Sequence, residues 1–254
     1  MSDCNCFLSL TDLAVGAMDI LFPHRCAACG KKLLGEHKRK MCSDCRSDIS
    51  FLQPPVCKIC GMELKGDKER SHICGRCLSN PPPYLLARSV VQYSSVVQKL
   101  LHGLKYGADT SVLPGIAEIL SQFDLAPFDH CDHIIPVPLH VKRLRQRGLN
   151  QSVLLAKIIF SNKTQSTLKT DFLIRARNTV PQTTLNGVER RKNLKDAFIV
   201  AQKAEIGQSS ICLVDDVFTT GTTVSECSRV LCRHGAKEVK VITFTRVESA
   251  QCGT

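Results

Sequence analysis

Two adjacent acids followed by a threonine-rich turn are the residues whose types and spacing best suit chemistry. The apolar run 211–214 ends at Asp215 and Asp216, and apolar positions return at helical spacing from Val224 onward. A strand, a tight loop and a helix in this order would gather backbone N–H groups, hydroxyls and a helix N-terminus around one point. We therefore predict a phosphate-binding loop; a helix merely capped by threonine is the plainer alternative. The loop residues are Thr219, Thr220, Gly221, Thr222 and Thr223.

The acids suit a ligand that carries hydroxyl groups beside its phosphate. A carboxylate accepts hydrogen bonds from hydroxyls, and a charge-assisted bond contributes roughly 1.5–3 kcal/mol. Gly221 allows the backbone to approach a ligand without a Cβ atom.

Residues 214–223 resemble the motif with which type I phosphoribosyltransferases bind phosphoribosyl pyrophosphate (PRPP). The resemblance implies that Asp215 and Asp216 hold the ribose hydroxyls and that residues 219–223 cradle the 5′-phosphate. It also implies Mg²⁺ as the companion of PRPP. In a working transferase, a nitrogen nucleophile would displace magnesium pyrophosphate from ribose C1. Asp215 and Asp216 are then the candidate catalytic residues, because they would fix the ribose and stabilise its cationic transition state.

Eight of the fifteen cysteines form four Cys-x-x-Cys pairs, a pattern typical of zinc in a reducing compartment. The two halves of the set form a near repeat, so we predict two successive Cys4 ribbons with structural zinc, with interleaved pairing as the alternative. Such small segments have little core, and structural zinc can contribute ~10–16 kcal/mol to their folding. The pairs are Cys26 and Cys29, Cys42 and Cys45, Cys57 and Cys60, and Cys74 and Cys77.

The order of patterns along the chain predicts three parts. Residues 1–25 would form an amphipathic helix, residues 26–80 the double zinc-ribbon module, and residues 81–254 a phosphoribosyltransferase-like domain, with three prolines at 81–83 as a spacer. Strands alternate with helices in the last part, which predicts an α/β fold with a mostly parallel sheet flanked by helices. The expected strands are 88–93, 132–138, 172–175, 211–214 and 239–244, and the expected helices are 96–104, 112–120, 152–160 and 223–234.

A second set of motifs, residues 135–140, 147–152 and 177–183, is similar to the ComF family when taken with the cysteine pairs and the phosphate loop. The likeness covers nearly the whole chain. It implies a role in DNA uptake during natural transformation, with single-stranded DNA and DNA-uptake proteins as partners. In the related transferases, residues placed like 177–182 form a hood over the reaction centre.

The loop after the expected strand 132–138 is the candidate for gripping pyrophosphate or a nucleic-acid backbone. Arginines at every second position do not share one helical face, so we expect a loop or a frayed turn there. A solvated basic surface is an equally good interpretation of each arginine. The candidates are Pro138, Leu139, His140, Arg143 and Arg147.

The formal charge of +11 favours anionic ligands, although zinc-bound thiolates would cancel part of it. Aromatic residues are sparse and tryptophan is absent, so DNA would be held mainly through its backbone charge. Residues 1–22 lack the basic start of a secretion signal, and no apolar run reaches membrane-spanning length, so we expect a cytoplasmic protein.

Three functions fit these patterns. The first is a DNA-uptake protein that binds a phosphoribosyl ligand on a transferase scaffold. The second is an active phosphoribosyltransferase of nucleotide metabolism, and the third is a PRPP-sensing regulator. The fold alone does not separate them.

Overall fold

The computed structural model describes residues 24–33, 39–64, 71–106, 109–161, 166–177, 194 and 196–248. The helix expected at residues 1–25 lies outside the described residues for all of its length up to position 23, because the structure describes the chain from residue 24 onward. The same holds for most of the expected hood, from Asn178 onward.

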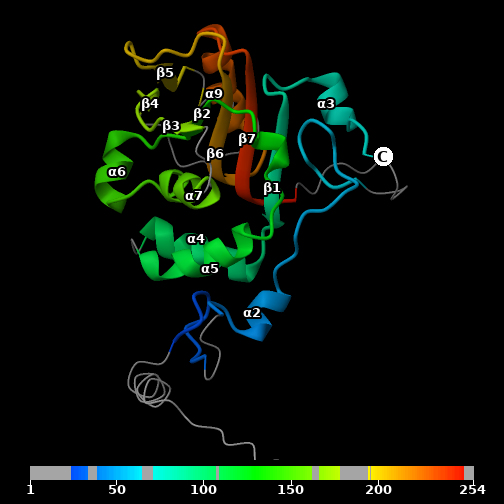
Figure 1. The fold of residues 1–254 in the computed structure, drawn as a ribbon, viewed down its shortest axis with the longest axis vertical. Helices are drawn as coiled ribbons and strands as arrows, with labels where there is room; N and C mark the ends of the chain where they lie inside the picture. The colour runs from blue at the N-terminus through cyan, green and yellow to red at the C-terminus, as the bar shows by residue number, and fades with distance from the viewer. Residues whose placement is uncertain are drawn as a thin grey trace, which may run out of the picture.

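A five-stranded parallel sheet forms the centre of the protein, with strand order β1-β7-β6-β2-β3 (Figure 1). Every neighbouring pair in it runs parallel. The expected mostly parallel α/β fold is therefore confirmed. The strands are β1 (Leu86–Gln92), β2 (His133–Pro136), β3 (Thr167–Leu168), β6 (Ser210–Phe218) and β7 (Glu238–Arg246).

Helices cover both faces of this sheet because its central strands are apolar on both sides. Cys212 and Val214 of β6 belong to one core, whereas Ile211 and Leu213 belong to the other. The first core includes α4 (Ser95–Tyr106), α5 (Leu113–Leu120) and α7 (Gln151–Ile159), and the second includes α9 (Thr222–Arg233). Short 3-10 turns, η1 (Thr110–Val112) and η2 (Ala126–Phe128), connect the elements between α4 and β2.

The strand expected at 172–175 forms outside the main sheet. It is β4 (Leu173–Arg175), and it pairs antiparallel with β5 (Phe198–Val200) in a separate two-stranded sheet. Leu173 and Phe198 turn inward and pack in the same core as α9. This small sheet therefore covers the α9 side of the fold.

Two expectations about local structure are wrong. We expected the strand at 211–214 to stop before the acids, but β6 continues through them to Phe218 and pairs with β7 over its whole length. We also expected a loop or frayed turn around the arginines, but Val141–Arg147 forms helix α6. His140 caps its start, and Gly148, at φ +74°, ends it in the left-handed conformation that glycine tolerates.

The two cysteine-rich segments pack on different parts of the body. The first contains α2 (Ser43–Ser47), and its Ala27 and Met41 lie against α5 so closely that a Cβ atom at Gly115 would clash with Ala27. The second contains α3 (Gly75–Ser79) and joins β1, where the Ala87 N–H donates to the Ile59 carbonyl at 2.6 Å. Figure 1 shows α2 and α3 far apart, with α4 and α5 next to α2. Within the described residues, no helix has the length and apolarity needed to cross a membrane.

Candidate functional site

The two acids lie inside strand β6, at the carboxyl edge of the parallel sheet, where ligands of such folds bind. Asp215 and Asp216 are 9% and 7% exposed. Asp215 Oδ1 accepts hydrogen bonds from Ser152 Oγ at 3.2 Å and from the Asp216 backbone N–H at 2.9 Å. These bonds fix the orientation of the Asp215 carboxyl group.

Asp216 forms an ion pair with Lys105, the penultimate residue of α4. Burial alone would favour the neutral acid, but the Lys105 charge outweighs it and lowers the pKa of Asp216. In return, the Asp216 carboxylate overcomes the effect of burial on Lys105 and raises the pKa of that lysine. Asp216 is thus held as a carboxylate with a fixed counter-charge.

Asp215 has the opposite character. Burial, together with the neighbouring Asp216 charge, raises the pKa of Asp215 to about 8. One acid is therefore neutral and the other charged near neutral pH. A neutral carboxyl group can donate a hydrogen bond while the carboxylate accepts, so the pair can engage two adjacent hydroxyls of a sugar.

The threonine-rich loop follows Phe218 and leads into α9, as predicted. Gly221 caps α9 with φ +75°, and a Cβ atom there would lie 2.6 Å from the ring of Phe218. The Thr220 and Thr222 hydroxyls share a hydrogen bond of 2.7 Å. A tight turn at the start of a twelve-residue helix directs backbone N–H groups to one point, which is the arrangement that binds phosphate.

The predicted loop after β2 lies next to the acids because β2 pairs with β6. Pro136 faces Val214 in the register, and the Val137 N–H donates to the Val214 carbonyl at 2.8 Å. The chain then continues through Pro138, Leu139 and His140 into α6, where the His140 ring accepts a hydrogen bond from the Lys142 N–H. The structure therefore brings the loop of residues 138–140 to the edge that carries Asp215.

Helix α6 places the arginines that follow on different faces. Arg143 and Arg147 are four residues apart and half-buried, whereas Arg145 is exposed. Arg147 lies 5.5 Å from the Tyr106 ring centroid, and its charge contributes to lowering the pKa of Asp216. Arg147 therefore lies near enough to Asp216 for their charges to interact, and Arg143 lies one helical turn away beside Arg147. A phosphate group at this place would meet guanidinium donors.

Three further neighbours of the acids are not among the site residues predicted from the sequence. Lys105 lies in the last turn of the amphipathic helix α4, and Ser152 lies in the first turn of α7. Arg175 lies in β4, buried and near enough to Asp215 for their charges to interact. Only the packing of the elements brings these residues together. A charged residue at the inward-facing end of an amphipathic helix was the signal available for Lys105.

Asn150 links the 147–152 motif to the carboxyl edge of the sheet. Its Oδ1 caps α7 by accepting from the Ser152 N–H at 3.0 Å, and its Nδ2 donates to the Val137 carbonyl at 3.1 Å. The motif therefore ties the start of α7 to the loop after β2 and sets Ser152 against Asp215.

The eight predicted cysteines form two groups of four, and in each group the sulfur atoms lie within 4.8 Å of one another. Two sulfur pairs, Cys29 with Cys42 and Cys60 with Cys74, are 3.7 and 3.8 Å apart. These separations match the edge of a ZnS4 tetrahedron with bonds of about 2.3 Å. The pairing is successive rather than interleaved, and both sets fit zinc.

Backbone donors prepare the cysteines for a metal. Burial raises the pKa of Cys57, but backbone N–H groups of Cys74, Cys60 and Ile59 outweigh it and lower the pKa to about 6. The same opposition lowers the pKa of Cys26 to about 7. A thiolate at the first cysteine of each ribbon is the form that binds zinc.

Comparisons with known proteins agree with these features. The model of the double zinc ribbon domain matches residues 17–78. The DNA utilization protein YhgH of Escherichia coli O157:H7 is 31% identical over 222 residues, which are 81% of this chain and 96% of that protein. Competence protein F of Haemophilus influenzae is 31% identical over 236 residues, 89% of this chain and 98% of that protein.

The chain belongs to the ComF family. Among solved structures, this ComF chain is similar to orotate phosphoribosyltransferase from Aeropyrum pernix, with 18% identity and a TM-score of 0.32, over 61% of this chain and 67% of that one.

Proposed function

We propose that this ComF-family protein acts in DNA uptake during natural transformation and binds PRPP, or a related phosphoribosyl ligand, together with Mg²⁺. The observation that carries the ligand assignment is the buried acid pair Asp215 and Asp216 at the carboxyl edge of the sheet, shortly before a tight turn at the N-terminus of α9. The acids would hold the ribose hydroxyls, and the backbone of residues 219–223 would hold the 5′-phosphate. The free thiolates that its zinc ribbons require favour a cytoplasmic location.

Magnesium suits the chemistry of the site because its preferred ligands are hard oxygen atoms. Phosphate oxygens of the ligand and the carboxylate of Asp216 are such donors. When bound, the ion would neutralise charge on the pyrophosphate. The protein itself would add the positive charges of Arg143 and Arg147 to those that neutralise the pyrophosphate.

Single-stranded DNA is the second ligand in this proposal. The net charge is +11, and the relatives include proteins named for DNA utilization and competence. The phosphate backbone would supply most of the affinity, so binding should weaken steeply with salt.

Turnover is a separate candidate activity, favoured by the arginines near the acids. Arg143, Arg147 and Arg175 would stabilise a departing pyrophosphate, and Asp215 and Asp216 would fix the ribose. The protein would then release pyrophosphate from PRPP when supplied with a nitrogen nucleophile.

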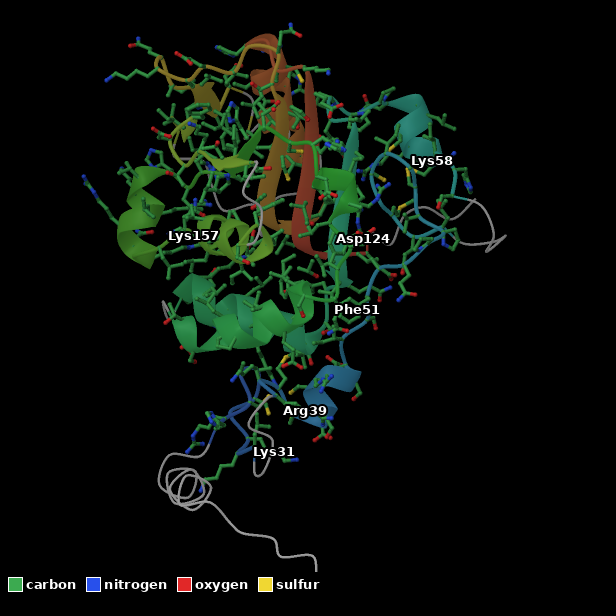
Figure 2. All side chains as sticks on the ribbon, in the orientation of Figure 1. Lys31, Arg39, Phe51, Lys58, Asp124 and Lys157 are labelled. Atoms are coloured by element: carbon green, nitrogen blue, oxygen red, sulfur yellow. The ribbon has the colours of Figure 1, made fainter. Side chains whose placement is uncertain are left out.

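Calorimetry of PRPP binding with and without Mg²⁺ tests the ligand assignment. The variant Asp215→Asn with Asp216→Asn should lose at least about tenfold in affinity, because it loses charge-assisted hydrogen bonds. Asp124→Asn is the matched control: Asp124 is an exposed acid, labelled in Figure 2, whose Oδ1 accepts a hydrogen bond from the Ala126 N–H at the start of η2. Unchanged affinity in the double variant would overturn the assignment.

Two parallel measurements separate the functions. Pyrophosphate release across a set of nucleobases would establish a transferase, whereas PRPP binding without release would establish a binding protein. Binding of a labelled single-stranded oligonucleotide at two salt concentrations tests the DNA role. Absence of binding at low salt would contradict that role.

A further inference from the structure

A pocket of about 600 Å³ opens between the second zinc ribbon and helix α9. One side is formed by α3 and the three prolines at 81–83, and the other by the phosphate loop and the outer face of α9. Asp215 and Asp216 do not line it. The pocket is thus a second concave site, and it shares only the loop with the sugar-phosphate site.

The charged lining of the pocket consists of three arginines and two acids, Asp196 and Glu226, so its net charge is +1. Arg76 reaches in from α3 and donates to the Thr220 carbonyl at 3.1 Å, which leaves other N–H groups of its guanidinium for a ligand. Arg229 pairs with Glu226, and Glu226 also accepts from the Asp196 N–H at 3.3 Å. Arg233 is exposed and has no ion-pair partner among the described residues.

The rest of the lining is of two kinds. Near the start of α9, hydroxyl groups are offered by Thr220, Thr222 and Ser225, while the prolines at 81–83 add apolar surface to the lining. Guanidinium and hydroxyl groups suit a phosphate, and an apolar wall suits a flat base. A nucleotide unit carries both parts in one ligand, whereas an acidic peptide offers carboxylates without a matching apolar plane.

We infer that this pocket holds a nucleotide unit of a single-stranded DNA chain, with its phosphate toward Arg76 and Arg233 and its base toward the prolines. The inference rests on the proposed binding of single-stranded DNA and gives that binding a location. It assigns DNA recognition to the junction between the second ribbon and α9, rather than to the arginines of α6.

The test is fluorescence anisotropy of a labelled oligothymidylate over a range of salt concentrations. The double variant Arg76→Gln with Arg233→Gln removes the two arginine charges of the pocket that have no ion-pair partner among the described residues. The matched control is Lys99→Gln with Lys157→Gln, which removes two exposed charges from α4 and α7; Figure 2 shows Lys157 on α7, well away from Lys58 of the second ribbon. The single variant Arg233→Gln changes only α9 and leaves the second ribbon unaltered. In the double variant, the measured zinc content shows whether the second ribbon is still folded.

We expect the pocket variant to bind about tenfold more weakly at low salt. Its slope of log affinity against log salt should fall by about 1.4, because each phosphate contact on a single strand contributes about 0.7. The control should change by less than about twofold. Equal losses of DNA affinity in the pocket variant and the control would overturn the inference but not the proposed DNA role. An unchanged affinity in the pocket variant, when the parent protein binds, would do the same. A parent protein that binds no oligonucleotide would overturn the proposed DNA role itself, and equal displacement by polyglutamate would overturn the nucleotide assignment.

Discussion

Arg246 lies over the ring of Phe218, with its guanidinium carbon 4.0 Å from the ring centroid. Both side chains are buried, and Arg246 also donates a hydrogen bond to the Cys60 carbonyl of the second zinc ribbon. Phe218 ends β6, and its ring fills the space beside Gly221 of the phosphate loop. Together with the bond from Arg76 to Thr220, this contact makes the second ribbon a support of the loop.

Replacing Arg246 by methionine should therefore loosen the phosphate loop. The change removes a desolvated cation–π contact of about 2 kcal/mol and leaves the Cys60 carbonyl without this donor. We expect lower stability in denaturant and weaker PRPP binding by calorimetry. Arg88→Met is the control, since Arg88 donates to the ribbon at the Lys58 carbonyl but does not contact Phe218. The same loss of PRPP affinity in both variants would contradict the supporting role.

Loss of one zinc ion should have different effects at the two sites. Cys60→Ser should remove the metal from the second ribbon and weaken PRPP binding, because the supports at Arg76 and Arg246 originate there. Cys29→Ser should remove the metal from the first ribbon and leave PRPP affinity within about threefold of the parent, since that ribbon packs on α5 instead. Zinc content by mass spectrometry and calorimetry on each variant provide the comparison. Weaker PRPP binding for Cys29→Ser alone would reverse this assignment.

Gly221→Ala should damage the loop by two effects at once. The φ of +75° disfavours any side chain, and the new Cβ would meet the Phe218 ring at 2.6 Å. We expect a loss of about 1–3 kcal/mol in unfolding free energy and weaker PRPP binding. Gly207→Ala is the control, because a Cβ atom at that position would point into open space and meet nothing within 4 Å. An unaltered melting temperature for Gly221→Ala would argue against the tight turn.

Lys105→Met should leave the Asp216 carboxylate buried without its partner. Breaking a buried ion pair in this way typically costs about 3–5 kcal/mol. We expect a large drop in melting temperature, which the second change Asp216→Asn should largely restore because it removes the unpaired charge. The double-mutant cycle measures the coupling. Additive losses would mean that the two residues act independently.

Asp215→Asn should change how stability depends on pH. An unfolded aspartate ionises near pH 4, whereas folded Asp215 keeps its proton up to about pH 8. Between these values the folded state binds more protons than the unfolded state, so this residue makes stability fall as pH rises. Asparagine keeps the acceptor oxygen that faces Ser152 and removes the titration. The melting temperature of the variant relative to the parent should therefore rise from about pH 5 to about pH 8. A pH-independent difference between the variant and the parent would refute the raised pKa.

Much of the fold and the chemistry of the site could be predicted from local patterns. Alternating strands and helices predicted the parallel sheet, and the residue types at 215–223 predicted an acid pair before a turn at the start of α9. Cysteine spacing predicted both metal sites, because each set of ligands lies within a short stretch of chain.

The errors arose where distant parts of the chain decide the structure. β6 continues past Val214 because Lys105 and Ser152 satisfy the acids inside the sheet and β7 pairs with its whole length. The short helix α6 forms because His140 and Gly148 supply its two ends, although its arginine spacing suggested no single helical face. Arg175 reaches the site only through the packing of β4 against the α9 side.

The close approach of Ala27 to Gly115 bears on how the protein can be divided. The double zinc ribbon is one unit of sequence, but its halves cover separate apolar regions of the same body, one at α5 and the other at β1. A fragment that begins after the prolines would expose both regions to water at once, and an isolated ribbon pair would lose the surfaces that hold its halves apart. The sequence unit and the packed unit therefore differ in this chain, because the two cysteine clusters are anchored to separate parts of one body.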